Sequence, residues 1–216
     1  SFTGTRFLWY MAALKGLSHR EAKTRVNELL ELVNLKDAAD RRIGGYSGGM
    51  KQRVVIAIAM ICNPDLIICD EPTTALDVTI QAQIMELLKE LQVKEGKSIV
   101  LITHNMGLVA EMADEVCVMY MGRVVEFGKL EDIFDNTCHP YTRALMGAVF
   151  DINMDFSKPI ESIESEAPSP LDLPQGCPFQ GRCEHCMDIC KKENPHLVEV
   201  ENGHSVACHL FQKGSK

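Results

Sequence analysis

The stretch DLIICDEPTTALD, residues 65–77, decides how this chain folds. Its first part, residues 66–69, is a short apolar run, and two acids and a proline follow it at once. Such a run predicts a short buried β-strand that delivers Asp70 and Glu71 side by side at its carboxyl end. A pair of adjacent acids, taken alone, is more often a solvated turn than a site. The neighbouring elements therefore decide which of the two applies here.

The elements on both sides of this strand alternate between helix and strand. Downstream, residues 78–92 carry apolar side chains at the spacing of one helix face, and residues 98–103 form a second short apolar run that predicts another buried strand. Upstream, residues 54–61 form an apolar segment whose length favours a buried helix. Residues 18–33 are amphipathic and open with the Ser-x-x-Glu spacing of a capping box. This alternation predicts an α/β layer with a parallel sheet.

The chain changes character twice after the second strand. Residues 106–112 predict a short helix, and residues 115–128 contain two β-rich runs around a turn at Gly122 and Arg123. From residue 151 the composition shifts to Ser, Pro and Glu, which is typical of a linker, and a short cysteine-rich tail follows. The predicted divisions are a domain over 1–150, a linker over 151–176 and a tail over 177–216.

Polar side chains come directly after both predicted strands. Because the carboxyl ends of parallel strands meet at one edge of a sheet, we expect Asp70, Glu71 and His104 to lie close together. An aspartate there can hold Mg²⁺ while a glutamate orients or deprotonates an attacking water, as phosphoryl transfer requires. A lone histidine is usually structural. Beside these two acids, however, it can hydrogen-bond a terminal phosphate.

The stretch GGYSGGMKQR, residues 44–53, predicts a phosphate contact as well. Ser47, Gly48 and Gly49 precede a helix whose first backbone amides lack partners inside the helix and carry partial positive charge. Glycines let the backbone approach phosphate oxygens, and the serine hydroxyl adds one hydrogen bond. A surface turn is the plain alternative. The order and spacing of the three motifs together favour the phosphate site.

These stretches together resemble a known family. YSGGMKQR, LIICDEPTTALD and LITHN are similar to the signature motif, the Walker B motif with its D-loop, and the switch-histidine loop of ATP-binding cassette (ABC) ATPases. HPYTRALM, residues 139–146, is similar to the ATP-binding subunits of oligopeptide and dipeptide importers, whose relatives carry nickel or glutathione. The resemblance implies the C-terminal portion of a P-loop NTPase-like ABC domain, with its helical subdomain and parallel-sheet core.

The resemblance also implies a role for each residue of the motifs. Asp70 is expected to serve Mg²⁺ through water, Glu71 to act as the catalytic base, and His104 to act as the switch. Asp77 would belong to the loop that crosses the dimer interface. The residues expected to contact ATP held by the opposite subunit are Ser47, Gly48, Gly49 and Gln52.

Partners and a location follow from the same resemblance. The expected protein is an ATP-hydrolysing subunit that powers peptide import as a homodimer or heterodimer, bound to membrane-spanning subunits at the cytoplasmic face of the cell membrane. Residues 1–216 contain no G-x-x-x-x-G-K-[ST] P-loop, so we expect no ATPase activity from this chain alone. Asn105 stands where these importers usually place an aspartate, which bears on the position of His104. Two alternatives stay open: an ABC-superfamily ATPase outside transport, and a non-enzymatic metal-binding or regulatory fragment.

Composition and charge limit the classes of partner. The 216 residues carry a net charge of -8, which argues against a general nucleic-acid binder. No apolar run is long enough to cross a bilayer, and the first sixteen residues lack the pattern of a signal peptide, so we expect a cytosolic chain. Because the cytosol keeps thiols reduced, a tight cysteine cluster there indicates metal rather than disulfides.

Five of the nine cysteines lie in the tail. Cys177, Cys183, Cys190 and Cys208 are widely spaced, and four thiolates can hold an iron-sulfur cluster or a tetrahedral zinc ion. The tail resembles the extension of peptide-importer ATPases, which carries a four-iron four-sulfur (4Fe-4S) cluster in several members, and Cys186 stands where a non-ligand is usual. A zinc site stays open, because Cys183 and Cys186 form a C-x-x-C pair with histidines nearby. We expect the 4Fe-4S cluster on the first four.

Overall fold

The computed structural model describes residues 2–147 and 174–212, and these residues form two compact units. The first unit ends at Leu108 and the second begins at Val109. The predicted linker over 151–176 lies outside the described residues except for its last three, so the predicted domain division stays a prediction. In the described part of the chain, no helix is both long and apolar enough to span a membrane.

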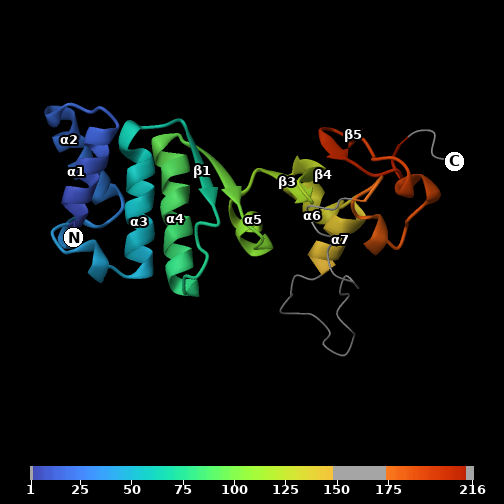
Figure 1. Ribbon diagram of the computed structural model, residues 1–216, viewed down its shortest axis with the longest axis horizontal. Helices are drawn as coiled ribbons and strands as arrows, with labels where there is room; N and C mark the ends of the chain where they lie inside the picture. The colour runs from blue at the N-terminus through green and yellow to red at the C-terminus, as the bar shows by residue number, and fades with distance from the viewer. Residues whose placement is uncertain (1, 148–173, 213–216) are drawn as a thin grey trace. The chain divides into compact units, whose positions relative to one another are not determined.

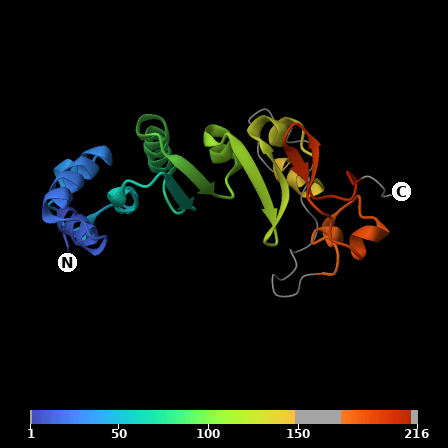
Figure 2. The same cartoon turned by 90° about the horizontal axis from the view of Figure 1, so that it is seen from above.

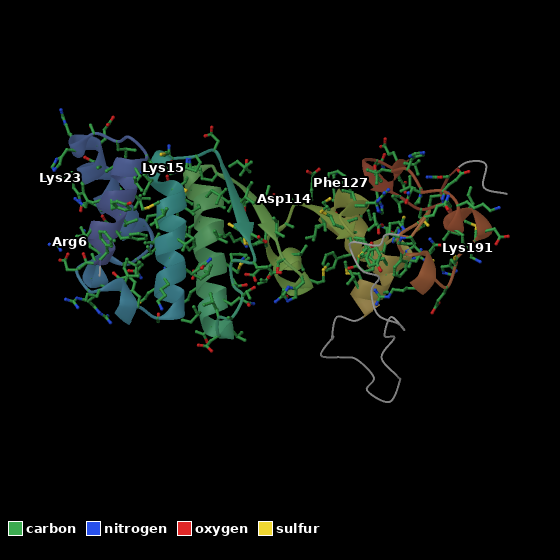
Figure 3. The ribbon with its side chains drawn as sticks, viewed as in Figure 1. Arg6, Lys15, Lys23, Asp114, Phe127 and Lys191 are labelled. Carbon is green, nitrogen blue, oxygen red and sulfur yellow. The ribbon has the colours of Figure 1, made fainter. Side chains whose placement is uncertain are left out.

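The first unit opens with a layer of helices (Figure 1). The elements of this layer are α1 (Gly4–Leu14), α2 (His19–Leu32), η1 (Lys36–Ala38), η2 (Ile43–Gly45), α3 (Gly48–Ala59) and η3 (Met60–Cys62). The predicted capping box is present at the start of α2, where Ser18 Oγ accepts from Glu21 N and the Glu21 carboxylate accepts from Ser18 N. Arg6 and Lys23 point outward from α1 and α2 (Figure 3). The apolar stripes of these helices, including Leu8, are buried between them.

A strand, a helix and a strand follow, as the sequence predicts. They are β1 (Leu66–Asp70), α4 (Val78–Glu95) and β2 (Ser98–Ile102). The helix ends at Gly96, whose φ of 63° is left-handed and favours glycine. β1 and β2 pair in parallel, with Asp70 opposite Ile102, so both strands end at the same edge. Figures 1 and 2 show α4 lying along one side of this strand pair.

The two strands are only half buried, which corrects the expectation that both would be buried. Alternate side chains of a strand point to opposite faces, and one face of this pair is uncovered in the part of the chain that the structure describes. Ile67 and Cys69 of β1 point to the covered face and are buried. The apolar side chains of the open face are Leu66 (50% exposed), Ile68 (64%), Val100 (45%) and Ile102 (49%).

The second unit is built on an antiparallel sheet. Its strand order is β3 (Glu115–Tyr120), β4 (Arg123–Lys129), β6 (His204–Val206) and β5 (Val198–Glu201). β3 and β4 form a hairpin in which Met121 and Gly122 both have positive φ, the geometry of a tight hairpin turn. The turn therefore lies one residue earlier than predicted. The helices and 3₁₀ turns are α5 (Met106–Met112), which begins in the first unit, α6 (Leu130–Asp135), α7 (Pro140–Gly147), η4 (Gln180–Arg182) and η5 (Asp188–Lys191).

The cysteine-rich segment shares the core of this second unit. β6 pairs with β4, with Ser205 opposite Phe127. Phe179 is buried, and its ring centroid lies 5.4 Å from that of Tyr120 on β3 and 5.5 Å from that of Tyr141 on α7. Residues 174–212 are therefore packed onto the hairpin and α7.

Candidate functional site

Strand register brings Glu71 and His104 together at the carboxyl ends of β1 and β2. The backbone N–H of Glu71 donates to the carbonyl of Ile102 at 2.9 Å, which continues the parallel ladder one residue beyond β1. Glu71 has a φ of 45°, so the chain leaves the strand direction here. His104 follows β2 by two residues and lies across from Glu71. The sequence predicted this meeting from the parallel order of the strands.

The carboxylate of Glu71 has a different partner on each oxygen. His104 Nδ1 donates to Oε1 at 2.7 Å, and Thr74 Oγ1 donates to Oε2 at 2.9 Å. These two donors, the His104 bond first, hold the pKa of Glu71 below its ordinary value. The His104 side chain is 84% exposed and that of Glu71 is 37% exposed. The carboxylate is thus ionised and within reach of solvent.

Two further acids flank this pair along the chain. Asp70 is the last residue of β1 and is exposed, so its carboxylate is open to a cation. Asp77 occupies the N-cap position of α4, is exposed, and makes no side-chain capping bond there. Both acids are therefore available for a ligand or partner, and the roles predicted for them stay predictions.

The glycines before α3 have a packing role that the sequence did not reveal. Ser47 is the N-cap of α3, and its Oγ accepts from Met50 N at 3.3 Å. A Cβ added at Gly49 would meet Ile80 Cγ2 at 2.5 Å, and one added at Gly48 would meet Leu76 Cδ2 at 3.1 Å. These glycines let the start of α3 approach the start of α4. Gln52, which is half-buried, lies one turn into α3, and the predicted nucleotide contacts of these residues stay predictions.

Asn105 has a local role that explains how an amide can replace an aspartate. Its Oδ1 accepts from the backbone N–H groups of Gly107 at 3.0 Å and Leu108 at 3.4 Å. An oxygen acceptor before a helix satisfies amides that have no partner inside it, and asparagine and aspartate both supply one. Thr103 Oγ1 in turn accepts from Asn105 N at 3.1 Å. Helix capping therefore holds the side chain of Asn105, the residue after His104, in place. The sequence could have indicated this role, because an asparagine directly before an apolar helix is a typical cap.

The backbone holds the cysteine segments of the tail close to each other. Cys177 N donates to the carbonyl of Cys190 at 2.7 Å, and Cys186 N donates to the carbonyl of Cys183 at 3.2 Å. Gly176 has a φ of 87°, and a Cβ there would collide with the carbonyl of Cys190. Glycine is therefore required at this close approach.

The tail thiols share one neighbourhood. Burial raises the pKa of Cys177, Cys183 and Cys186, and nearby thiols raise it further. Burial likewise raises the pKa of Cys208 to about 11, and Cys177, Cys183 and Cys190 add to that effect. Uncharged thiols in such a site become thiolates when a metal binds them.

Two histidines of the tail are hydrogen-bonded through Nε2. His204 Nε2 donates to Glu126 Oε1 at 2.8 Å, and His209 Nε2 donates to the carbonyl of Glu193 at 2.9 Å. His185 is exposed. His209 Nδ1 is buried without a hydrogen-bond partner among the described residues, so His209 and the exposed His185 keep the mixed zinc site open, whereas His204 is held by Glu126.

Glu126 forms a second cluster, buried in the sheet of the second unit. It is 0% exposed, and Oε1 accepts from Cys138 N at 2.6 Å as well as from His204, while Oε2 accepts from His139 N at 3.0 Å. Among the described residues, Glu126, Cys138 and His204 form a group whose ligand atoms lie within 4.8 Å of one another. Because the carboxylate is already bound by three donors, the cluster serves as a structural tie between β4, β6 and the residues before α7.

Comparisons with known proteins agree with these motifs. The family model described as "ABC transporter" matches residues 5–74, and that described as "Oligopeptide/dipeptide transporter, C-terminal region" matches residues 125–190. The oligopeptide transport ATP-binding protein AppD of Bacillus subtilis is 45% identical over 203 residues, covering 92% of this chain and 61% of that protein. The dipeptide transport ATP-binding protein DppD of Haemophilus influenzae is 47% identical over 206 residues, covering 92% and 62%. The chain therefore spans about three fifths of the length of the curated relatives it matches.

A solved structure supports the same fold. CbiO1 of Clostridium perfringens, part of the ABC transporter complex CbiONQ, matches 63% of this chain and 55% of its own chain with a TM-score of 0.58 and 31% sequence identity. The α/β architecture predicted from the alternating strands and helices is confirmed by this match.

Proposed function

Since this chain belongs to the family of ABC transporter ATP-binding proteins, we propose that it forms part of an ATP-hydrolysing subunit that powers peptide import. The observation that carries the proposal is the 2.7 Å contact between His104 Nδ1 and Glu71 Oε1 at the end of the parallel strands. Relatives that are 45–47% identical are named as oligopeptide and dipeptide transport proteins, which supports peptides as the cargo class.

In the proposed reaction Glu71 acts as the general base. Its carboxylate takes a proton from a water whose oxygen attacks the γ-phosphorus of ATP, the bond from that phosphorus to the bridging oxygen breaks, and ADP and phosphate form. His104 donates a hydrogen bond to the γ-phosphate and loses that partner on hydrolysis. Asp70, exposed at the end of β1, fits Mg²⁺ through water, and the ion would neutralise phosphate charge.

The nucleotide in this proposal is shared between two subunits. The amides at the start of α3, with Ser47, Gly48, Gly49 and Gln52, would contact ATP bound to the P-loop of a homologous partner. The 12-residue length of α3 supports this, because its aligned peptide dipoles place partial positive charge at the first turn, where such a phosphate would bind. Asp77 would lie at the same interface. The dimer would sit on membrane-spanning subunits at the cytoplasmic face of the membrane, as a peripheral protein.

The replacement of Glu71 by glutamine tests the assignment of the base. In a longer form that carries a P-loop, Glu71→Gln should keep ATP binding and the closed dimer but lower turnover by about 100-fold or more, because a general base contributes this much. Residues 1–216 alone should show no turnover. Glu86→Gln, an exposed change on α4, is the matched control. Undiminished hydrolysis by Glu71→Gln would remove Glu71 from this role.

We propose further that Cys177, Cys183, Cys190 and Cys208 hold a 4Fe-4S cluster with a structural role. Cys183 and Cys190 lie near enough to Cys177 and Cys208 to raise the pKa of both, which supports a shared metal group. Zinc sites more often use two paired C-x-x-C units, and the tail contains only one such pair, Cys183 and Cys186, which favours a cluster whose thiolates bind different iron atoms.

Metal analysis of the purified chain tests this second proposal. Protein prepared without oxygen should be brown, contain iron and sulfide, and bleach in air. Cys208→Ser should lose the colour, whereas Cys186→Ser, the matched control in the same tail, should keep it. A colourless anaerobic preparation that holds one zinc per chain would contradict the cluster, and loss of metal only on changing Cys186 would contradict the ligand set.

A further inference from the structure

We infer that Thr74 is a positioning residue for Glu71: its hydroxyl holds one carboxylate oxygen in place while the other oxygen passes from His104 to the attacking water. The inference rests on the proposed ATPase function and adds a residue to its machinery. Thr74 touches Glu71 rather than the substrate, so it acts through Glu71.

Each oxygen of the Glu71 carboxylate accepts a hydrogen bond from a different donor. Thr74 Oγ1 donates to Oε2 at 2.9 Å, and His104 Nδ1 donates to Oε1 at 2.7 Å. The two donors come from different elements, one from the turn after β1 and one from the end of β2. Since they bind different oxygens, His104 can leave Oε1 without disturbing the bond at Oε2.

His104 and Thr74 differ in how firmly other contacts hold them beside Glu71, and this difference decides which of them moves. The side chain of His104 is 84% exposed, so a swing toward a phosphate breaks little besides its bond to Glu71. Thr74 lies three residues from Glu71 on the same turn, and its backbone N–H also donates to the Glu71 carbonyl at 3.2 Å. Thr74 therefore stays beside Glu71 when His104 departs.

The turn that carries Thr74 is held in an uncommon conformation. Glu71 has a φ of 45° and Ala75 a φ of 61°, both in the left-handed region that non-glycine residues seldom occupy. A left-handed backbone conformation persists where the surrounding hydrogen bonds hold it. In this turn it brings the Thr74 hydroxyl within hydrogen-bond distance of the Glu71 carboxylate. A free glutamate side chain samples many rotamers, so this bond limits the loss of orientation once His104 has moved.

Titration of Glu71 in the 216-residue chain tests the contact without any need for ATPase activity. Thr74→Val keeps the side-chain shape and the backbone bond but removes the hydroxyl, while Thr74→Ser keeps the hydroxyl. NMR of carboxyl-labelled glutamate, assigned with Glu71→Gln, should give a higher pKa of Glu71 in Thr74→Val and the parent value in Thr74→Ser. His104 across the edge and Asp70 along the chain are present in all three proteins. Thr79→Val, at an exposed threonine on α4, is the matched control.

An unchanged Glu71 pKa in Thr74→Val would overturn the inference. Thr74 is exposed, so the substitution leaves the apolar core intact, and the dispersion of the remaining amide signals verifies the fold.

Turnover in a longer form with a P-loop tests the consequence. Thr74→Val should lower kcat by about tenfold, the worth of one hydrogen bond to a charged group, and leave KM for ATP unchanged. The acid limb of the pH profile should move to higher pH, because the base must be ionised and its pKa has risen. Thr74→Ser should restore both. A Thr74→Val enzyme with parent kcat and parent acid limb would overturn the positioning role.

The two experiments separate this inference from the function on which it rests. If Glu71→Gln stops turnover but Thr74→Val leaves the Glu71 pKa in place, the ATPase proposal stands and the inference fails. If Thr74→Val raises the pKa but Glu71→Gln hydrolyses ATP normally, the contact is real and the proposed role of Glu71 fails.

Discussion

At the scale of single residues, burial determines the protonation of His139. The ring is 2% exposed, and its Nδ1 accepts from the backbone N–H of Tyr141 at 3.0 Å. Burial lowers the pKa of His139 to about 4, and the opposing charge of Glu126 offsets only part of this effect. A proton on Nδ1 would also break the bond from Tyr141, so the neutral form belongs to the folded state.

The second unit should therefore lose stability as the pH falls below about 6.5. Between that ordinary pKa and the folded value of about 4, the unfolded chain binds more protons at His139 than the folded chain does. The loss from this residue between pH 8 and pH 5 is roughly 2 kcal/mol. Urea unfolding followed through the NMR signals of β4 measures it. His139→Asn should remove this part of the pH dependence, whereas His19→Asn, on exposed α2, should not. Equal pH slopes in all three proteins would contradict the assignment.

At the scale of elements, α5 shows how a short helix depends on one cap. It has seven residues and one buried side chain, Leu108, so packing contributes little to it. The amides of Gly107 and Leu108 are instead satisfied by Asn105 Oδ1. Short helices gain little from propensity alone, so the cap carries a large share of the stability of α5.

Asn105→Ala should open the first turn of α5. The loss of the cap costs about 1 kcal/mol, which corresponds to roughly fivefold faster amide exchange at Gly107 and Leu108. Asn105→Asp keeps the acceptor and should retain the exchange rates of the parent chain. Faster exchange in Asn105→Asp than in Asn105→Ala would show that a different contact holds this turn.

The elements that the sequence predicted well are those with local patterns. The spacing of apolar residues located α4, the capping box located α2, and the parallel order of β1 and β2 placed Glu71 beside His104. Thr74 could not be assigned in this way, because its contact depends on the left-handed turn at Glu71, which no spacing encodes.

Contacts between segments that are distant in the sequence could not be predicted from local patterns either. β6 has three residues and no strong alternation, so its pairing with β4 could not be read locally. The packing role of Gly49 depends on Ile80 of another helix, which only the assembled layer brings near. The motif suggested a phosphate contact or a surface turn as the reason for glycine at this position, and the structure adds the close approach of Ile80.

At the scale of the whole molecule, the open face of β1 and β2 is the main exposed apolar surface of the first unit's sheet. Leu66, Ile68, Val100 and Ile102 lie on neighbouring strands and are each 45–64% exposed. Contiguous apolar side chains on an exposed sheet bind hydrophobic probes and promote self-association.

The 216-residue chain should bind an environment-sensitive dye such as anilinonaphthalene sulfonate while folded. Ile68→Thr keeps a β-branched side chain on the strand and should lower dye fluorescence and self-association without loss of secondary structure. Val93→Ala, at a valine on α4 that is 74% exposed, should leave both unchanged. Dye binding that persists in Ile68→Thr would locate the apolar surface elsewhere.

The tie made by Glu126 has a consequence for the order of events on the ribosome. The hairpin of β3 and β4 is local and can close as soon as residue 129 has emerged, but His204 is 78 residues beyond Glu126. Synthesis at about 5–20 residues per second leaves an interval of about 4–16 seconds between the two. Throughout that interval the edge of β4 lacks its partner strand, and a charged carboxylate stands on it. A charged residue at a strand edge disfavours pairing with other chains. Glu126, which later binds His204 on β6, therefore protects the nascent hairpin until β6 has been made.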